Sequence, residues 1–245
     1  RVLIGELMES VNADASLNEG WRQAITNLAT RIEVLTEAEQ AGLRVKAIVG
    51  GVGADRSLAI QQLVVAASQQ FTPSDIAVIS MLKDPSSALG RFCHEHDIAS
   101  YMAPDAASLK TALSTVKSCR QVFIETPDLT PSLGGQDPAV NALLKQRAGL
   151  TALLVLPCTV QEAYLQLLMT HAEQLPLAGS VLTHLGDATS IGPVLGILAG
   201  RDIPVAGVAD SANSELLRIT SEGLINESKR LARRSLERKN QQLKV

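Results

Sequence analysis

Aromatic side chains and cysteines are scarce in this chain of 245 residues, and long apolar runs are missing from it. Phe, Trp and Tyr make up 2% of the residues although 46% are hydrophobic, so the core must consist mainly of Leu, Ile, Val and Ala. That composition suits parallel strands covered by helices on both faces. No apolar run approaches the roughly 18 residues that a membrane-spanning helix needs. The net charge of −3 is too small to indicate binding of nucleic acid.

The three cysteines, Cys93, Cys119 and Cys158, are scattered along the chain and odd in number. A disulfide framework is therefore not expected, and a reducing compartment such as the cytoplasm is. Since the sequence begins at Arg1 without Met, we expect it to be part of a longer protein.

Three regions differ in their hydrophobic pattern. Residues 1–42 carry apolar positions at helical spacing and predict a small helical domain, a hairpin of two amphipathic helices ending near Gly42. Residues 43–212 alternate short apolar runs with helical stretches, and residues 213–245 predict one basic helix from about Asn213 to Leu243. The positions expected to pack are Ile4, Leu7, Met8 and Val11, then Trp21, Ile25, Leu28, Ile32 and Leu35, and Leu217, Leu224 and Leu231 in the last helix.

The middle region predicts an α/β fold, a doubly wound and mostly parallel sheet of about seven strands. The expected strands are Val45–Val49, Ile76–Met81, Ile98–Tyr101, Val122–Glu125, Ala152–Leu156, Ser180–Thr183 and Pro204–Val208. The expected helices are Leu58–Gln70, Ser86–His94, Ala106–Ser118, Pro138–Arg147, Val160–Gln174 and Ile191–Ala199. Binding sites in such sheets lie at the carboxyl ends of the strands.

A glycine-rich turn follows the first of these strands, in V-K-A-I-V-G-G-V-G-A-D-R-S at Val45–Ser57. Such turns cradle phosphate through backbone amides at a helix N-terminus. A working P-loop places Lys and then Ser or Thr after its last glycine. Counted from the last glycine here, Ala54 and Asp55 take those two positions. The vestigial nucleotide-binding positions of this loop are Gly50, Gly51, Gly53, Ala54, Asp55, Arg56 and Ser57.

Four further stretches lie in a fixed order along the chain: V-F-I-E-T-P-D at 122–128, L-L-V-L-P-C-T at 153–159, S-V-L-T-H-L-G-D-A-T-S-I-G at 180–192 and D-I-P-V-A-G-V-A-D at 202–210. Together they resemble the nucleotide-site loops of the signal-recognition-particle GTPases and, in the T-S-I-G and P-V-A details, the flagellar member of that family. The resemblance implies the NG-domain fold, with GTP and magnesium as the ligands. It also implies GTP-dependent dimers and a location at the cell pole, where the flagellar member works with a MinD-like ATPase.

The nucleotide-site positions depart from the family pattern. Besides Ala54 and Asp55, the family's D-T-Y-R is missing from the short Ile79–Pro85 segment. In the third loop Glu125 and Thr126 stand where the family has Asp-Thr, a tolerable change. Pro127 and Asp128 replace Ala-Gly there, which removes an amide and adds a negative charge beside the γ-phosphate position.

In the base-reading loop, Thr183 is kept, but Gly186 replaces the Asp that specifies guanine. Asp187 comes one position late and is expected to point elsewhere. We therefore predict a degenerate pseudo-GTPase with no catalytic residues, no metal and no cofactor, its site filled by side chains such as Arg56 and Asp55. The alternative is an unusual site that still binds GTP with magnesium and hydrolyses it.

Other candidate sites have less support. A dinucleotide fingerprint at Gly51 and Gly53 lacks its third glycine, since Arg56 stands there. His94 and His96 would point apart on a helix and are expected at the surface. Cys158 follows a strand end and could be a nucleophile, but a small core residue is the more ordinary interpretation.

The resemblance implies action through a protein partner, either a second copy or a flagellar or polar protein. A further alternative is an anionic-surface module that uses the basic end of the last helix. The residues expected to bind there are Arg230, Arg233, Arg234 and Arg238, and contact with the inner membrane or the pole is left open. No nucleic-acid partner is expected.

Overall fold

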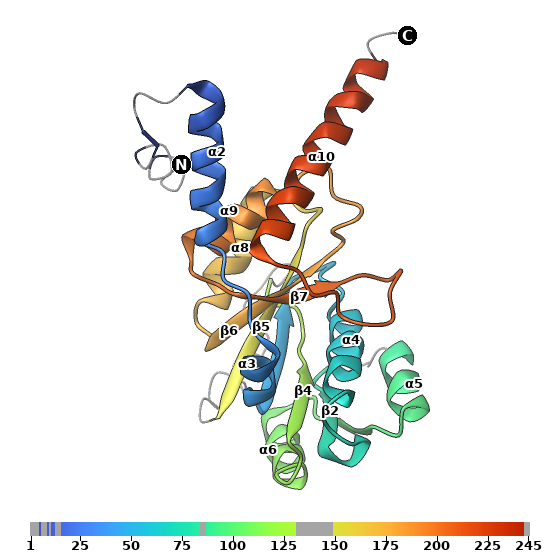
Figure 1. Ribbon diagram of the computed structural model, residues 1–245. Coiled ribbons are helices and arrows are strands. Elements are labelled where there is room, and N and C mark those ends of the chain that lie inside the picture. Colours follow the sequence, from blue (N-terminus) through green and yellow to red (C-terminus); the bar gives the residue numbers. More distant parts are fainter. Residues whose placement is uncertain are drawn as a thin grey trace.

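The computed structural model describes residues 5, 9, 11, 12, 16–83, 87–130 and 149–242, and it is an α/β fold built on one seven-stranded sheet (Figure 1). The strand order is β3-β2-β4-β1-β5-β6-β7, and every pairing is parallel. The predicted parallel, doubly wound sheet is therefore confirmed. The strands are β1 (Val45–Gly50), β2 (Ile76–Ser80), β3 (Ala99–Met102), β4 (Gln121–Glu125), β5 (Leu150–Pro157), β6 (Leu177–Thr183) and β7 (Val205–Ala209).

Helices cover both faces of the sheet. The helices are α2 (Leu17–Thr30), α3 (Glu37–Gly42), α4 (Arg56–Ser68), the short 3-10 helix η1 (Pro73–Asp75), α5 (Ser87–Glu95), α6 (Ala106–Thr115), α8 (Glu162–Ala172), α9 (Gly192–Gly200) and α10 (Ser221–Gln242). The helix predicted at Pro138–Arg147 lies outside the described residues, as do Ile4, Leu7 and Met8.

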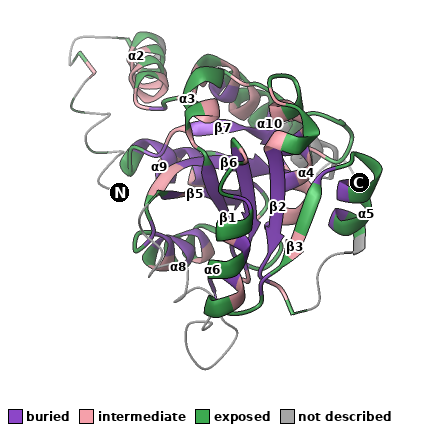
Figure 2. Ribbon diagram, turned by 90° about the horizontal axis from the view of Figure 1, so that it is seen from below, coloured by how far each residue is buried: buried purple, intermediate pink, exposed green. Residues whose placement is uncertain are grey.

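Alternate residues of β1 enter two separate cores. Ala47 and Val49 belong to the larger core, which includes apolar side chains of α6, α8, α9 and α10. Ile48 belongs to the smaller core with α4 and α5. Each strand residue of β1 is therefore buried, and Figure 2 shows buried strands in the middle with exposed residues gathered on the helices. A parallel sheet covered on both faces needs apolar strands, which explains the composition.

The second predicted N-terminal helix is interrupted, and the first lies largely outside the described residues. α2 ends at Thr30, and the chain then runs extended beside β7, where Val34 pairs with Val205 in a parallel bridge. The next helix, α3, starts only at Glu37, and its N-cap residue Thr36 forms a capping box with Glu39. Trp21 was expected to pack, but it is 68% exposed, so that prediction is wrong.

The last helix also begins later than predicted. Residues 213–220 do not join it, because Leu217 forms an antiparallel bridge with Val208 of β7. Leu217 is accordingly partly exposed, whereas Leu224 and Leu231 of α10 are buried as expected. α10 packs against α2 and then extends beyond the body of the molecule (Figure 1). None of the described helices combines the length and the apolar character that crossing a membrane would take.

Candidate functional site

The glycine-rich loop joins β1 to α4 with the spacing of a phosphate loop, but the register differs from the predicted one. Gly50 ends β1, and the first helical residue of α4 is Arg56. In the strand–GxxxxGK[ST]–helix pattern, counting from Gly50 places Asp55 at the second glycine, Arg56 at the lysine and Ser57 at the hydroxyl residue. The prediction that Ala54 and Asp55 take the lysine and threonine positions is therefore wrong by two residues.

The register of the phosphate loop cannot be read from its glycines, because Asp55 replaces the second glycine and adopts the same backbone conformation. Its φ is +53° and its ψ +51°, in the left-handed region. Asp reaches this region more readily than most non-glycine residues, although left-handed backbone costs an L-residue about 1–2 kcal/mol. Its side chain is exposed and caps no amide of α4. Asp55 thus leaves the loop geometry intact and adds a carboxylate at its rim, and it does not fill the site as predicted.

Arg56 does fill the site. Its Nη1 donates to the carbonyl oxygens of Gly50 at 3.1 Å and Gly51 at 3.0 Å. The same nitrogen lies 2.5 Å from Oδ1 of Asp128, which comes from the loop after β4. The Arg56 side chain is 14% exposed and that of Asp128 40%. The guanidinium is thus held on the loop between two carbonyls and a carboxylate.

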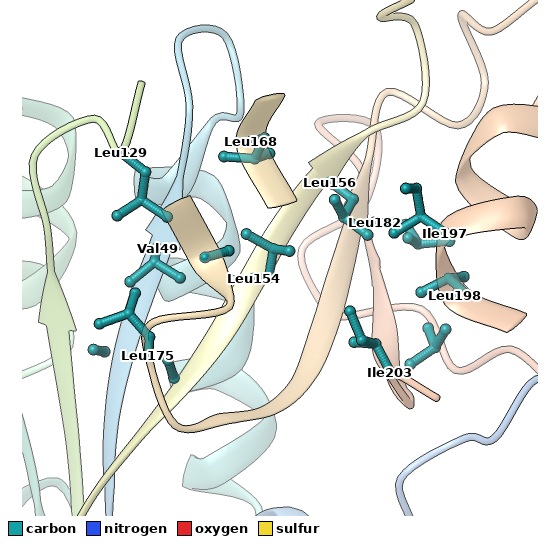
Figure 3. Close-up of a cluster of buried hydrophobic side chains, with 14 of the residues drawn as sticks. Val49, Leu129, Leu154, Leu156, Leu168, Leu175, Leu182, Ile197, Leu198 and Ile203 are labelled. Atoms are coloured by element: carbon teal, nitrogen blue, oxygen red, sulfur yellow. The ribbon is translucent and has the colours of Figure 1, made fainter. Parts of the chain in front are cut away.

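Two further contacts hold the loop against neighbouring elements. The amide of Leu129 donates to the Gly50 carbonyl at 2.9 Å, and the Leu129 side chain enters the core near Val49 (Figure 3). From α8, the Tyr164 hydroxyl donates to the Val52 carbonyl at 3.1 Å. A Cβ added to Gly51 would lie 2.0 Å from that hydroxyl, so only glycine fits there without movement of Tyr164.

Glu125 ends β4 as a buried carboxylate, 1% exposed. Its Oε1 accepts from the Ser57 hydroxyl at 2.6 Å, and its Oε2 accepts from the Ser80 hydroxyl, also at 2.6 Å. None of the ion pairs between described residues involves Glu125. Thr126, which follows it, donates to the Ile48 carbonyl at 2.9 Å and so fastens β4 to β1.

The base-reading side has fewer contacts. Thr183 is buried and donates to the Ala54 carbonyl at 3.2 Å, which links the end of β6 to the phosphate loop. His184 has a φ of +55°, and its Nδ1 lies 3.8 Å from Oδ2 of Asp187, whose side chain is 80% exposed. A Cβ at Gly186 would meet only Oδ2 of Asp210, at 3.8 Å.

A nucleotide such as GTP, which the family binds with magnesium, would meet negative charge at this loop. A phosphate in the loop would have to displace the Asp128 carboxylate from Arg56 and would lie near the exposed Asp55. Two like unit charges about 4 Å apart repel by on the order of 4 kcal/mol at an intermediate dielectric. As arranged, the loop would oppose a nucleotide phosphate with the carboxylates of Asp55 and Asp128.

The structure brings together more residues than the sequence pattern indicated. The loop positions, Glu125, Thr126 and Thr183 meet at the carboxyl edge of the sheet as expected. Asp128 was named as a disruptive charge, but its pairing with Arg56 was not foreseen. Ser80 and Tyr164 were missed, because the contact of Ser80 with Glu125 and that of Tyr164 with the loop depend on the tertiary fold.

The remaining candidates have structural explanations. Cys158 is 3% exposed, and burial raises the pKa of its thiol to about 12, so it is a core residue and a poor nucleophile. His94 and His96 are exposed, and the His96 ring lies 4.4 Å from that of Phe92.

In the basic helix, Arg230 donates from Nε to Glu227 at 2.8 Å, and Arg233 and Arg234 are exposed. The Arg238 side chain lies outside the described residues.

The fold class of this chain follows from its similarity to solved structures. No family model matches the chain. The signal recognition particle receptor FtsY from Elizabethkingia anophelis superposes with a TM-score of 0.65 at 18% identity, over 92% of this chain and 79% of that one. The fold is therefore that of the signal-recognition-particle-type GTPases, as the sequence motifs predicted.

Within that class, the similarity is to FlhF. The flagellar biosynthesis protein FlhF of Pseudomonas aeruginosa is 25% identical over 214 residues, covering 83% of this chain and 48% of that protein. The chain thus spans about half the length of this curated relative. A crystal structure of FlhF complexed with GTP/Mg²⁺ superposes with a TM-score of 0.72 at 16% identity, over 93% of this chain and 91% of that one. The chain is thus similar in sequence to FlhF and has the fold of an SRP-type GTPase.

Proposed function

We propose that this chain is an FlhF-like pseudo-GTPase, which keeps the GTPase fold as a scaffold and works by binding another protein. The observation that carries this proposal is the pair of carboxylates at the phosphate loop. Asp55 takes the position of the second loop glycine, and Asp128 reaches the Arg56 guanidinium from the loop after β4. Negative charges at both places oppose a triphosphate by Coulomb repulsion.

The base-reading side supports the same proposal. Where the family has the guanine-specifying Asp, this chain has Gly186, and Asp187 is exposed beside His184. A site built to hydrogen-bond a base loses most of its selectivity when that acceptor is removed. Loss at both halves of the site argues against an enzyme that depends on GTP.

A scaffold that does not bind nucleotide presents the same partner-binding surface at all times, because no bound ligand changes its conformation. Its complex, with a second copy or with a flagellar or polar protein, would then form without GTP. The flagellar context rests on the name of the relative FlhF and on the sequence similarity to it. A cytoplasmic location, peripheral at the inner membrane or the pole, belongs to the same proposal.

Calorimetry with GTP, GDP and ATP in the presence of Mg²⁺ tests the proposal. We expect no binding to the wild-type chain up to millimolar nucleotide. A variant with Asp55→Gly, Arg56→Lys, Asp128→Gly and Gly186→Asp restores the phosphate-loop motif, the glycine of the third loop and the guanine-specifying Asp. It serves as the matched control, for which we expect measurable binding. Micromolar binding of any of the nucleotides by the wild-type chain would contradict the proposal.

A second candidate function is supported by the far part of α10. Arg233 and Arg234 are exposed there, and they line a shallow groove together with Asn226, Lys229, Arg230 and Glu237. The helix extends past the body of the molecule (Figure 1), so these cations are accessible to an anionic surface. Pelleting with vesicles that contain anionic lipid, with Arg233→Glu and Arg234→Glu as the variant, tests it. Unchanged pelleting of the variant would exclude α10 as the contact.

A further inference from the structure

The phosphate loop has kept its anion-binding geometry, although the nucleotide does not fit. The turn from β1 to α4 has the spacing of a P-loop, and Arg56 replaces lysine with a side chain that is charged at all ordinary pH values. Arg56 Nη1 donates to the carbonyl oxygens of Gly50 and Gly51, and these bonds fix the cation at the loop. A guanidinium held in this way is a receptor for a carboxylate or a phosphate oxygen.

We propose that this receptor is occupied by the chain's own Asp128, whose carboxylate takes the place of a nucleotide phosphate. The inference rests on the proposed function, because it assumes that no nucleotide competes for the loop. Asp128 Oδ1 lies 2.5 Å from Arg56 Nη1, close enough for a charge-assisted hydrogen bond. The internal carboxylate thereby links the phosphate loop to the loop after β4, as a bound γ-phosphate would link them.

A second contact makes the same link independently of charge. The Leu129 amide, next to Asp128, donates to Gly50 at 2.9 Å, and the Leu129 side chain is 1% exposed. Burial of Leu129 fixes the backbone that carries Asp128, so the carboxylate is presented to Arg56 at little cost in entropy. The two loops are therefore joined in one arrangement without a diffusible ligand.

The receptor is not fully satisfied by Asp128. The Nε of Arg56 is buried and has no hydrogen-bond partner among the described residues. A planar guanidinium prefers two parallel bonds to an oxyanion, and here the ion pair with Asp128 uses Nη1 alone. An oxyanion with more acceptor oxygens than a carboxylate, such as pyrophosphate, is thus the class of ligand that the loop would take once Asp128 is removed.

The experiment compares three variants by calorimetry with Mg²⁺-free pyrophosphate as the probe. Each carries Asp55→Asn, since Asn also tolerates left-handed backbone and removes the second carboxylate. The first has no other change, the second adds Asp128→Asn, and the third adds Asp128→Asn with Arg56→Met. A hydrogen bond to a charged group contributes about 1.5–3 kcal/mol, so we expect the second variant to bind about tenfold to a hundredfold more tightly than the first. The third should lose that gain.

Amide hydrogen exchange of the same variants gives a readout that needs no ligand. Removal of the Asp128 charge should speed exchange of the Leu129 amide, whereas Glu173→Gln, which breaks the Arg201–Glu173 pair elsewhere, should leave it unchanged. Equal pyrophosphate affinity in the first and second variants, or in the second and third, would overturn the inference. Binding of GTP by the wild-type chain would instead contradict the proposed function, so the two failures are distinguishable.

Discussion

The two ends of β1 each bury a cation, and they accommodate it in different ways. At the amino end, Lys46 is 3% exposed, donates to the Gln121 side-chain carbonyl and lies 4.8 Å from the centre of the Phe123 ring. None of the ion pairs between described residues includes it. At the carboxyl end, the Arg56 side chain is 14% exposed and is paired with Asp128.

The pKa separates the two ends. Burial lowers the pKa of Lys46 to about 7, because no carboxylate compensates for the loss of hydration. A guanidinium stays protonated, so Arg56 must be neutralised by a partner. A lysine that is buried without a carboxylate partner, like Lys46, can lose its charge by deprotonation. The carboxyl end of β1 instead keeps a compensated charge at the place where the family binds phosphate, which is how a remodelled binding site would look.

The largest expected effect is a dependence of stability on pH that is caused by Lys46, and removing this lysine removes the contrast between the two ends of β1. Between pH about 7 and 10 the folded chain has lost the Lys46 proton and the unfolded chain has kept it, so the free energy of unfolding rises with pH by up to about 1.4 kcal/mol per unit. Lys46→Met removes this slope and is more stable than wild type at pH 7. Urea unfolding at several pH values measures it.

Cysteine titration cancels in that experiment when the variant is subtracted from wild type at each pH. If wild type and Lys46→Met show parallel pH profiles, the amine is charged when buried, and the contrast with Arg56 fails.

The next effect is expected at Ser80, which sharpens the account of the carboxyl end. Ser80→Ala leaves the buried Glu125 with only the Ser57 hydroxyl, and an unmet acceptor on a buried charge costs about 2–3 kcal/mol. Ser190→Ala is the control, because its hydroxyl only accepts from the Gly192 amide on an exposed loop. Equal stability losses in the two variants would show that Glu125 is not held by its hydroxyl donors.

A smaller effect is expected from Gly51→Ala. The new methyl would push the Tyr164 hydroxyl off the loop and break its bond to the Val52 carbonyl, at a cost of about 1 kcal/mol, since the end of a tyrosine can move. Gly186→Ala on the base-reading side meets nothing nearer than 3.8 Å and should be almost neutral. Thermal unfolding of both variants measures the difference, and a neutral Gly51→Ala would mean that Tyr164 does not hold the loop.

Most of the fold could be predicted from the sequence, because period and burial agree along the strands. β1, β4 and β5 begin and end within two residues of the predicted bounds, since short apolar runs between helices leave few alternatives. The start of α10 was misplaced because Leu217 continues the apolar spacing of the helix, although its backbone pairs with Val208. Sequence spacing cannot distinguish these two uses of one leucine.

The site could be located from the sequence but not described. The glycines and the loop order pointed to the carboxyl edge of the sheet. The register failed because Asp55 adopts a glycine-like conformation, so the last glycine of the sequence is not the last residue of the loop that needs such a conformation. The Arg56–Asp128 pair joins elements far apart in the chain, and only the tertiary fold brings the two side chains into contact.

The central claim is that protein side chains have replaced the nucleotide in this loop. Amide NMR of the wild-type chain during titration with GTP and Mg²⁺ tests it most directly, because the amides of residues 50–57 and of Leu129 report on the loop itself. The account predicts that these signals do not move up to millimolar nucleotide. Shifts of the loop amides that saturate at micromolar GTP would contradict it.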